Sequence, residues 1–323
     1  MGEPVITVHL HGDWARRALV DDVRTGLAAV PRSLPPKWLY DERGSKLFDE
    51  ITRLPEYYPT ERERSILHRC APSLATRTRA ATLVELGSGT SDKTRVLLDA
   101  LRDGGTLTHF VPVDVSESTL REAALTLSET YPGVQVEALV CDFGDIPALP
   151  GGGPRMIAFL GGTIGNLDRV ERRVFLGALR ALLDAGDWLL LGTDLVKSTD
   201  RLIAAYDDPG GITADFVSNS LRVVNRELGG DFDLDRFTYV PLWDPVEERM
   251  DLRMRSEVEQ CVHIPGAEIE VTLAAGEEVR IEISSKFRLE GIAGELGEAG
   301  FAVDEHYLDD AGDYALTLAR VGG

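Results

Sequence analysis

The sequence predicts an α/β protein built on an open parallel sheet, with a second lobe of mixed helices and strands. Between residues 80 and 196, short apolar segments alternate with segments of helical spacing, as in a parallel sheet that is covered on both faces. After Val196 this alternation stops, and two helical segments are followed by strands of alternating polarity. A last helix and a hairpin after residue 286 would complete the first sheet.

Composition and charge narrow the range of partners. The chain has 323 residues, 43% of them hydrophobic, which is enough to bury a sizeable core. Its 54 acidic residues against 34 basic ones give a net charge of −20, and this argues against a nucleic-acid partner, because such binding depends on Lys and Arg contacts to phosphate. No apolar run approaches a membrane span, and no export signal is expected. The three cysteines are widely spaced, which predicts a reducing, cytoplasmic location.

The first sixty residues are expected to form a helical arm. Apolar residues at helical spacing predict a helix that stops at Pro55, and Thr60 with Glu63 has the spacing of a capping box at the start of the next helix. Two proline-bounded loops present Tyr40 and Tyr57 among other aromatic side chains. Such rings either line a pocket or pack the arm against neighbouring structure.

The strands and helices of the sheet follow in order along the chain. The predicted strands are compact, apolar and bounded by Gly, Asp or Pro, and they cover residues 81–86, 110–115, 134–142, 155–162 and 187–196. Predicted helices cover residues 94–103, 117–131 and 172–186. In the second lobe, helices are expected at 199–208 and 212–228 and strands at 250–264, 267–276 and 277–287. Ligands of parallel sheets bind beyond the carboxyl ends of the strands, so a site is expected there.

The loop after the first predicted strand resembles a phosphate-binding loop without being one. In TLVELGSGTSDKT, residues 82–94, Asp92 stands where a P-loop would carry its second glycine, just before Lys93. A dinucleotide fingerprint fails at the same residue, because it requires a small third residue after Gly87-x-Gly89. The loop therefore suits a ligand that has no pyrophosphate.

Three successive strand ends carry the parts of a nucleoside site. Gly87 allows close backbone approach, Asp114 is placed to accept from two ribose hydroxyls, and Asp142 with Phe143 can accept from an adenine amine and pack on the base. An acidic residue, Glu85, precedes the glycines. Together these residues favour S-adenosylmethionine over a nicotinamide cofactor in a Rossmann-like sheet, although any one of these acids could simply cap a helix.

Other candidate residues are ambiguous by themselves. Asn166 follows the fourth strand in FLGGTIGNL and is either a substrate contact or a turn residue. Glu282 and Ser284 lie two residues apart, hence on one face of a strand, which is ordinarily a solvated face. The six histidines show no metal-ligand spacing, so no catalytic metal is expected, and a nucleophile elbow is absent.

The motifs combine into a resemblance to a known enzyme family. The segments RSLPPKWLYD, LFDEITRLPEYYPTERE, LVELGSGTSDKT, FLGGTIGNL, LLLGTDLVK, AYDDPGGIT, NRELGGDFDLD, AAGEE and SSKF resemble the actinobacterial histidine Nα-methyltransferases of ergothioneine biosynthesis. This resemblance runs from about residue 20 to the C-terminus. It implies three methyl transfers from S-adenosylmethionine to the α-amino group of L-histidine, giving hercynine, by a monomeric enzyme.

The resemblance also implies domains and residue roles. It implies a methyltransferase domain at 61–196, completed by 287–323, and a substrate-binding lobe made of the arm 1–60 and the insertion 197–286. By position, Tyr57, Asn166 and Tyr206 would hold the substrate's carboxylate and amine, with Tyr40 beside the reacting nitrogen, and Glu282 and Ser284 would bind the imidazole. The cofactor positions would be Gly87, Lys93, Asp114, Asp142 and Phe143.

Two departures from the family pattern affect the substrate pocket. Leu252 stands where the family has a methionine near the imidazole, and Gly162 stands where the family has a serine. Leucine for methionine nearly conserves volume, so a preference for histidine is still expected. The alternatives are a betaine synthase for another amino acid, which would need other groups at 282 and 284, and a non-catalytic regulator that binds S-adenosylmethionine.

Overall fold

The computed structural model describes residues 3–10, 12–89, 91 and 93–322. The chain divides into two compact units, each formed by segments that are distant in the sequence. The first unit comprises Met1–His11, Pro59–Val196 and Phe287–Gly323, and the second comprises Gly12–Tyr58 and Lys197–Lys286. Each unit has its own sheet and its own hydrophobic core.

The first unit is built on an eight-stranded sheet with the order β1-β5-β4-β3-β6-β7-β14-β13. Its strands are β1 (Val5–Val8), β3 (Thr82–Leu86), β4 (His109–Asp114), β5 (Gln135–Val140), β6 (Arg155–Phe159), β7 (Trp188–Asp194), β13 (Phe301–Leu308) and β14 (Tyr314–Val321). All pairs from β1 to β7 are parallel, and β14 is antiparallel to both of its neighbours. The strand order reverses direction between β3 and β6, which is where open α/β sheets bind ligands.

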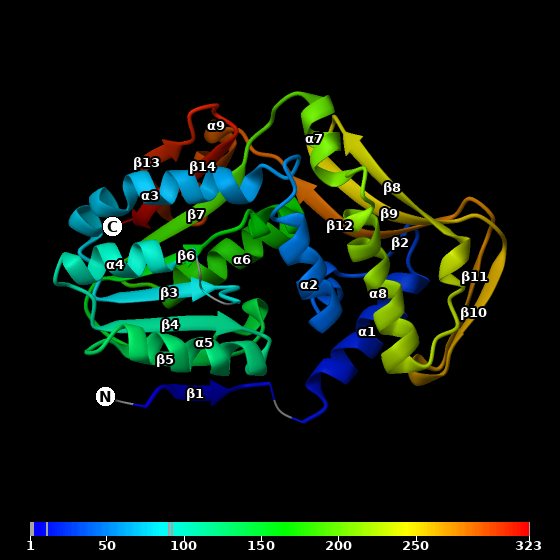
Figure 1. Cartoon of the computed structure of the whole chain (residues 1–323), viewed down its shortest axis with the longest axis horizontal. Coiled ribbons are helices and arrows are strands. Elements are labelled where there is room, and N and C mark those ends of the chain that lie inside the picture. The colour runs from blue at the N-terminus through cyan, green and yellow to red at the C-terminus, as the bar shows by residue number, and fades with distance from the viewer. Residues whose placement is uncertain (1–2, 11, 90, 92, 323) are drawn as a thin grey trace. The chain divides into compact units, whose positions relative to one another are not determined.

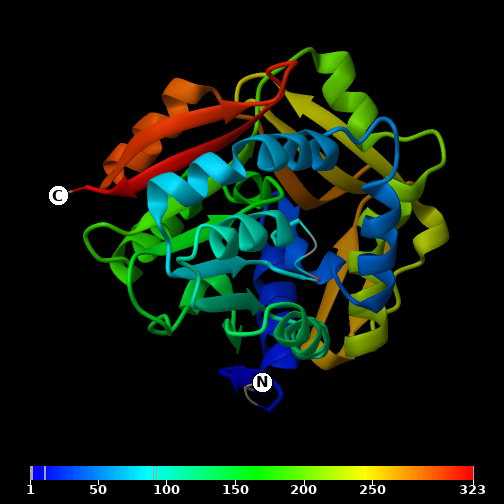
Figure 2. The same ribbon diagram turned by 60° about the vertical axis from the view of Figure 1, so that its left-hand side comes forward.

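Helices cover both faces of this sheet (Figures 1 and 2). On one face, α3 (Pro59–Thr78), α4 (Arg95–Asp103) and α5 (Glu117–Thr130) share a core with the strands. On the other face, α6 (Arg169–Leu182) and α9 (Leu289–Glu298) enclose a second core with the strands. Because both faces are covered, β3 is buried along its whole length and its sequence is apolar except for Thr82 and Glu85.

The second unit combines a four-stranded sheet, a separate hairpin and four helices. The sheet has the order β2-β12-β9-β8 and is made of β2 (Arg32–Ser33), β8 (Phe237–Asp244), β9 (Arg249–Ser256) and β12 (Glu278–Ser285). The hairpin pairs β10 (Gln260–Ile264) with β11 (Ile269–Leu273). The helices are α1 (Trp14–Ala28), α2 (Glu42–Ile51), α7 (Thr199–Tyr206) and α8 (Ile212–Leu228), and they share one core with the strands.

The predicted α/β class and the order of strands and helices in the parallel sheet are confirmed. Three strands, β1, β2 and β8, were not predicted, and the single strand expected at 250–264 is two strands, β9 and β10, which belong to different sheets. The predicted capping box is wrong, because α3 already begins at Pro59 and Glu63 is a fully buried residue with other partners. Among the described residues, none of the helices combines the length and apolar character that crossing a bilayer requires.

Candidate active site

The loop after β3, which contains the predicted cofactor position Gly87, contacts two other predicted cofactor positions, Phe143 and Asp114. Gly87 has a φ of +67°, and a Cβ at this position would lie 3.2 Å from the ring of Phe143. The backbone N–H of Gly89 donates to the carboxylate of Asp114 at 3.1 Å, and the other oxygen of Asp114 accepts from the N–H of Ser116 at 3.0 Å. The carboxylate at the end of β4 therefore holds the glycine loop in place. Asp92, on which the exclusion of a phosphate loop depends, lies outside the described residues.

Asp142 and Phe143 follow β5 and begin the short 3₁₀ turn η2 (Phe143–Asp145). One oxygen of Asp142 accepts from the N–H of Gly144 at 2.8 Å, so this acid does cap a turn, as the alternative interpretation supposed. The ring of Phe143 is half-buried and packs edge-on against Phe159 at the end of β6, with 5.9 Å between ring centroids. A flat apolar surface, the ring of Phe143, therefore lies next to Gly87, and the carboxylate of Asp142 precedes it in the chain; an adenine base would require both features.

Lys93 contacts a buried carboxylate, Glu63, for which the sequence predicted only a role in capping a helix. Its ammonium lies 2.6 Å from Oε2 of Glu63, a residue of α3 that is 0% exposed. The other oxygen of Glu63 accepts from the N–H of Gly161 at 2.7 Å and from the hydroxyl of Tyr314 at 2.8 Å. This network joins the loops after β3 and β6, where the strand order reverses. Lys93 itself keeps 27% of its side chain exposed, so it can also approach a ligand carboxylate.

Glu85 is buried within β3 and accepts a hydrogen bond from Thr94. Burial raises the pKa of Glu85 to about 7, because a carboxylate loses hydration there. The hydroxyls of Thr94 and Ser91 and the nearby Lys93 act in the opposite direction and do not outweigh it. Near neutral pH this side chain is therefore close to half protonated.

Asn166 ends the 3₁₀ turn η3 (Thr163–Asn166) that follows β6, and it is half-buried. The turn starts at Gly162, whose φ is +69°. A glycine suits this left-handed conformation better than the family serine does, so the departure at Gly162 has a local conformational explanation.

In the second unit, Glu282 and Ser284 lie on β12 and are buried, with 9% and 7% exposure. The solvated face that the alternation would ordinarily indicate is not found, because residues on both faces of this strand are buried. Leu252 of β9, 1% exposed, is the direct antiparallel partner of Glu282. A residue at position 252 is therefore the cross-strand neighbour of the predicted imidazole-binding carboxylate.

Tyr206, Ser284 and Lys286 form a closed hydrogen-bonded group. The hydroxyls of Tyr206 and Ser284 lie 2.8 Å apart, and the ammonium of Lys286 donates to both, at 2.7 Å and 2.8 Å. Lys286 is only 4% exposed and also lies over the ring of Tyr206, 4.7 Å from its centroid. Three side chains that are separated by up to 80 residues in sequence thus fix each other's orientation.

Aromatic contacts link the three tyrosines predicted to lie near the substrate. The rings of Tyr57 and Tyr206 have centroids 6.3 Å apart, and Phe48 lies between Tyr57 and Tyr40, at 6.2 Å and 5.5 Å. Tyr40 as a whole residue is 42% exposed. Loss of hydration around its hydroxyl, and then the negative charge of Glu282, raise the pKa of that hydroxyl well above the usual value. Tyr40 therefore stays protonated at physiological pH.

Two residues of these networks, Glu63 and Lys286, were missed by sequence reasoning, although both left a signal. Glu63 occupies the apolar stripe of α3 together with Ile66 and Leu67, and a carboxylate at a core position indicates a buried partner. Lys286 continues the every-second-residue series that begins at Glu282. Had these alternate polar residues been interpreted as a buried row, Lys286 would have been identified with them.

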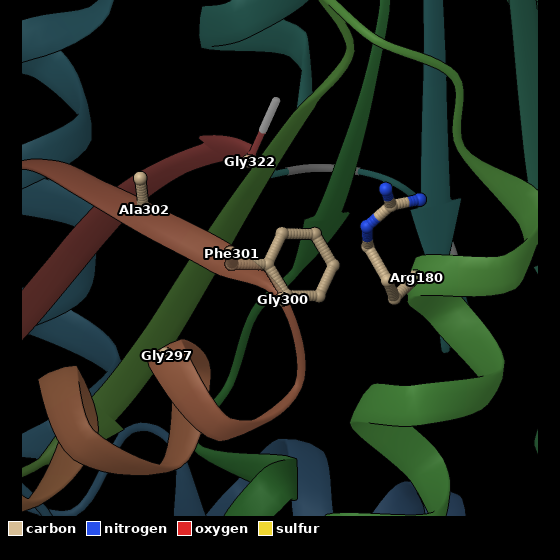
Figure 3. A pocket seen from close by; sticks show the side chains of 6 residues that line it. All are labelled: Arg180, Gly297, Gly300, Phe301, Ala302 and Gly322. Atoms are coloured by element: carbon tan, nitrogen blue, oxygen red, sulfur yellow. The ribbon is translucent and has the colours of Figure 1, made fainter.

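A separate hollow of about 380 Å³ lies in the first unit and contains none of the predicted site residues. Figure 3 shows Arg180 of α6 and Phe301 of β13 at this hollow, with Gly297 of α9 and Gly300 of the turn between α9 and β13. Its lining is too poor in hydrogen-bonding side chains to hold a nucleoside or an amino acid. By contrast, the loops after β3, β4 and β5 provide a glycine approach, a carboxylate and a ring, and these fit S-adenosylmethionine.

Comparison with solved structures agrees with this fold. An S-adenosylmethionine-dependent methyltransferase from Clostridium acetobutylicum matches 86% of this chain and 99% of its own, with a TM-score of 0.50 and 10% sequence identity. At this identity the match supports the predicted methyltransferase fold and nothing about the substrate.

Comparison of sequences is more specific. Histidine N-alpha-methyltransferase from Mycolicibacterium smegmatis is 50% identical over 312 residues, which cover 96% of this chain and 97% of the relative. An L-tryptophan methyltransferase from Psilocybe serbica is 29% identical over 91% of this chain and 90% of the relative. The model of histidine-specific, S-adenosylmethionine-dependent methyltransferases matches residues 19–321. The resemblance inferred from the motifs is therefore confirmed, and this chain belongs to the family of histidine-specific, S-adenosylmethionine-dependent methyltransferases.

Proposed function

We propose that this enzyme transfers three methyl groups in succession from S-adenosylmethionine to the α-amino nitrogen of L-histidine, forming hercynine for ergothioneine biosynthesis. Family membership and a relative of that name support the proposal. The structural observation that carries it is the pair of buried polar side chains on β12, Glu282 and Ser284, which lie two residues apart on one face of the strand and offer a carboxylate and a hydroxyl to a polar ligand.

The imidazole ring matches this pair chemically. A neutral imidazole has one N–H donor and one acceptor nitrogen, and Glu282 would accept from the first while Ser284 would donate to the second. Lys286 donates to the oxygen of Ser284, and when the hydroxyl of Tyr206 donates to the same oxygen, the hydroxyl proton of Ser284 is left for a ligand. A side chain without two opposed polar atoms would make only one of these two hydrogen bonds, which selects against it.

Positioning is the main catalytic task that remains for the protein. When bound, S-adenosylmethionine supplies an electrophilic methyl group on a cationic sulfur. Asp114 would accept from its ribose, Asp142 and Phe143 would bind its adenine beside Gly87, and Lys93 would pair with its carboxylate. Glu63 holds Lys93 at that loop. The methyl transfer then requires a neutral amine whose lone pair is aligned with the methyl group.

The tyrosines suit an amine that must lose a proton before each transfer. Tyr40 stays neutral because its pKa is raised, so it can accept or relay a hydrogen bond without adding a charge that would hold the amine protonated. Tyr57 and Tyr206 would hold the carboxylate and the amine of the substrate. Asn166 of the first unit would share this task, an assignment that rests on the family resemblance alone. Electron-rich rings also tolerate the quaternary ammonium group of the product.

We further propose that the enzyme acts as a monomer in the cytoplasm and needs no metal for catalysis. Its three cysteines are free thiols, which agrees with a reducing compartment. A second candidate function, methylation of another amino acid, is favoured by Leu252 beside Glu282 and by the relative named for L-tryptophan, because an indole N–H can also donate to a carboxylate. The remaining alternative is a regulator that binds S-adenosylmethionine without turnover.

Mass spectrometry of the purified enzyme with S-adenosylmethionine and an equimolar mixture of the twenty amino acids tests the proposal. The expected result is a gain of three methyl groups on histidine alone, with three equivalents of S-adenosylhomocysteine formed. Methylation of tryptophan or another amino acid instead would leave the cofactor assignment intact and refute the imidazole assignment. Binding of S-adenosylhomocysteine without any methylated product would favour the regulator.

A further inference from the structure

The exposed face of the β10–β11 hairpin carries a cluster of metal-ligating side chains. Cys261 and His263 lie two residues apart on β10, and Glu270 of β11 is the antiparallel partner of His263. All three are exposed, whereas Val262 and Val271 on the opposite face are buried in the core of the second unit. The strand register therefore places a thiol, an imidazole and a carboxylate on one side of the hairpin.

The donor atoms of these residues are close enough to share one ion. The sulfur, one imidazole nitrogen and one carboxylate oxygen all lie within 4.8 Å of one another. Nε2 of His263 is 2.8 Å from the carboxylate of Glu270. The thiol of Cys261 also hydrogen-bonds to that carboxylate. All three side chains are thus already directed at one point.

Asp231 holds the imidazole of His263 from the other side. One of its carboxylate oxygens accepts from the backbone N–H of His263 at 2.7 Å, and the other lies 3.5 Å from Nδ1. The backbone N–H of Asp231 in turn donates to the carbonyl of His263 at 3.2 Å. A carboxylate on the far nitrogen of a histidine is the arrangement that orients metal-binding histidines, because it fixes which nitrogen is left for the metal.

We propose that Cys261, His263 and Glu270 bind a zinc ion, with Asp231 orienting the imidazole. Binding replaces the thiol proton, which passes to solvent, and water completes the coordination. A thiolate and an imidazole favour Zn²⁺ over Mg²⁺ or Ca²⁺, which prefer oxygen ligands. The ion would tie β10 to β11 and to the segment of Asp231. None of its ligands belongs to the residues proposed to bind histidine or S-adenosylmethionine, so the site is structural.

Competition between the reduced, untagged full-length enzyme and a chromogenic zinc chelator tests this site. We expect one zinc ion per chain, at least tenfold weaker binding in Cys261→Ser and in His263→Ala, and about tenfold weaker binding in Asp231→Asn. The exposed residues His9 and Glu259 supply matched controls, because His9→Ala and Glu259→Gln should leave zinc affinity unchanged.

Cobalt substitution provides a second readout that does not depend on stability. Co²⁺ bound to the parent protein should give a sulfur-to-cobalt absorption band in the near ultraviolet, and Cys261→Ser should lose it. Failure to bind zinc at micromolar concentrations, or zinc binding that is unchanged in both Cys261→Ser and His263→Ala, would overturn the proposal.

Discussion

The two units of this enzyme build their binding residues in different ways. In the first unit, the candidate residues stand in loops just beyond parallel strands, and backbone N–H groups hold them, as Gly89 and Ser116 hold Asp114. In the second unit, Glu282 and Ser284 lie within a strand and Tyr206 at the end of a helix, and Ser284 is held by the side chains of Lys286 and Tyr206. Backbone-held sites follow from topology, whereas sites held by side chains depend on which residues the packing brings together.

This difference explains why one site is general and the other specific. A carboxylate fixed by backbone groups at a strand end tolerates sequence change around it, and it serves any ligand that contains the same nucleoside. A buried polar group whose orientation is fixed by several side chains is selective, because a ligand that cannot hydrogen-bond to it in that orientation loses water contacts without replacing them. Substitutions in the two units should therefore separate cofactor binding from amino-acid selection.

The largest expected effect comes from Glu282→Ala. The value of kcat/KM for histidine should fall by at least about 100-fold, because the imidazole N–H loses a charged acceptor in a buried site. Affinity for S-adenosylhomocysteine, measured by calorimetry, should stay within about twofold, since the cofactor residues belong to the first unit. Glu278→Gln is the matched control on the same strand; Glu278 pairs with Arg253 and Arg255, so its loss should lower stability without changing substrate preference. Turnover of Glu282→Ala near the parental rate would refute the imidazole assignment.

Glu85→Gln should change how the stability of the first unit depends on pH. The folded pKa of Glu85 is about 7, above its value of 4.5 in the unfolded chain, so the folded state holds a proton that the unfolded state has lost. The unfolding free energy therefore decreases as pH rises from about 4.5 to about 7, by roughly 3 kcal/mol, and above that range this group adds no further change. Urea unfolding between pH 5 and 8 should show this slope in the parent and a flatter profile in Glu85→Gln. Identical slopes in both proteins would contradict the assignment.

Asp114→Asn is expected to weaken S-adenosylhomocysteine binding by about 10- to 100-fold, because an anionic acceptor is lost both to the ribose and to the N–H of Gly89. Asp168 offers a control in the same unit, since its carboxylate caps α6 by accepting from the N–H groups of Val170 and Glu171. Asp168→Asn should cost at most about 1 kcal/mol of stability and leave affinity intact. If both variants lose affinity equally, the effect of Asp114 is one of general stability.

The smallest effect is predicted for Gly162→Ser, which introduces the serine that the family resemblance implies at this position. Because φ is +69° there, serine should destabilise the enzyme by about 1 to 2 kcal/mol, measured as a lower Tm. Gly177→Ser on the exposed side of α6 provides the control and should be neutral or slightly stabilising. An unchanged Tm for Gly162→Ser would show that the turn relaxes when serine is introduced.

Much of the fold was predictable because its signals are local. Apolar runs of five to seven residues bounded by Gly or Asp correspond to β3, β6 and β7, and helical spacing found α4 to α6. Short or half-exposed strands gave no such signal: β1 is four residues long, and β8 has no fully buried residue. The fused prediction at 250–264 failed for a related reason, since alternation continues through the turn that separates β9 from β10.

The acids and glycines at the ends of β3, β4 and β5 could be identified as candidate site residues from the sequence alone. A buried parallel strand and the residue after it are recognisable from their neighbours along the chain. Only the tertiary structure decided that Glu63 joins Lys93 to Gly161, that Leu252 lies opposite Glu282, and that Lys286 orients Ser284. The same holds for Glu270 beside His263. These partners are chosen by strand register and by helix packing over long sequence separations, and no local pattern specifies either one.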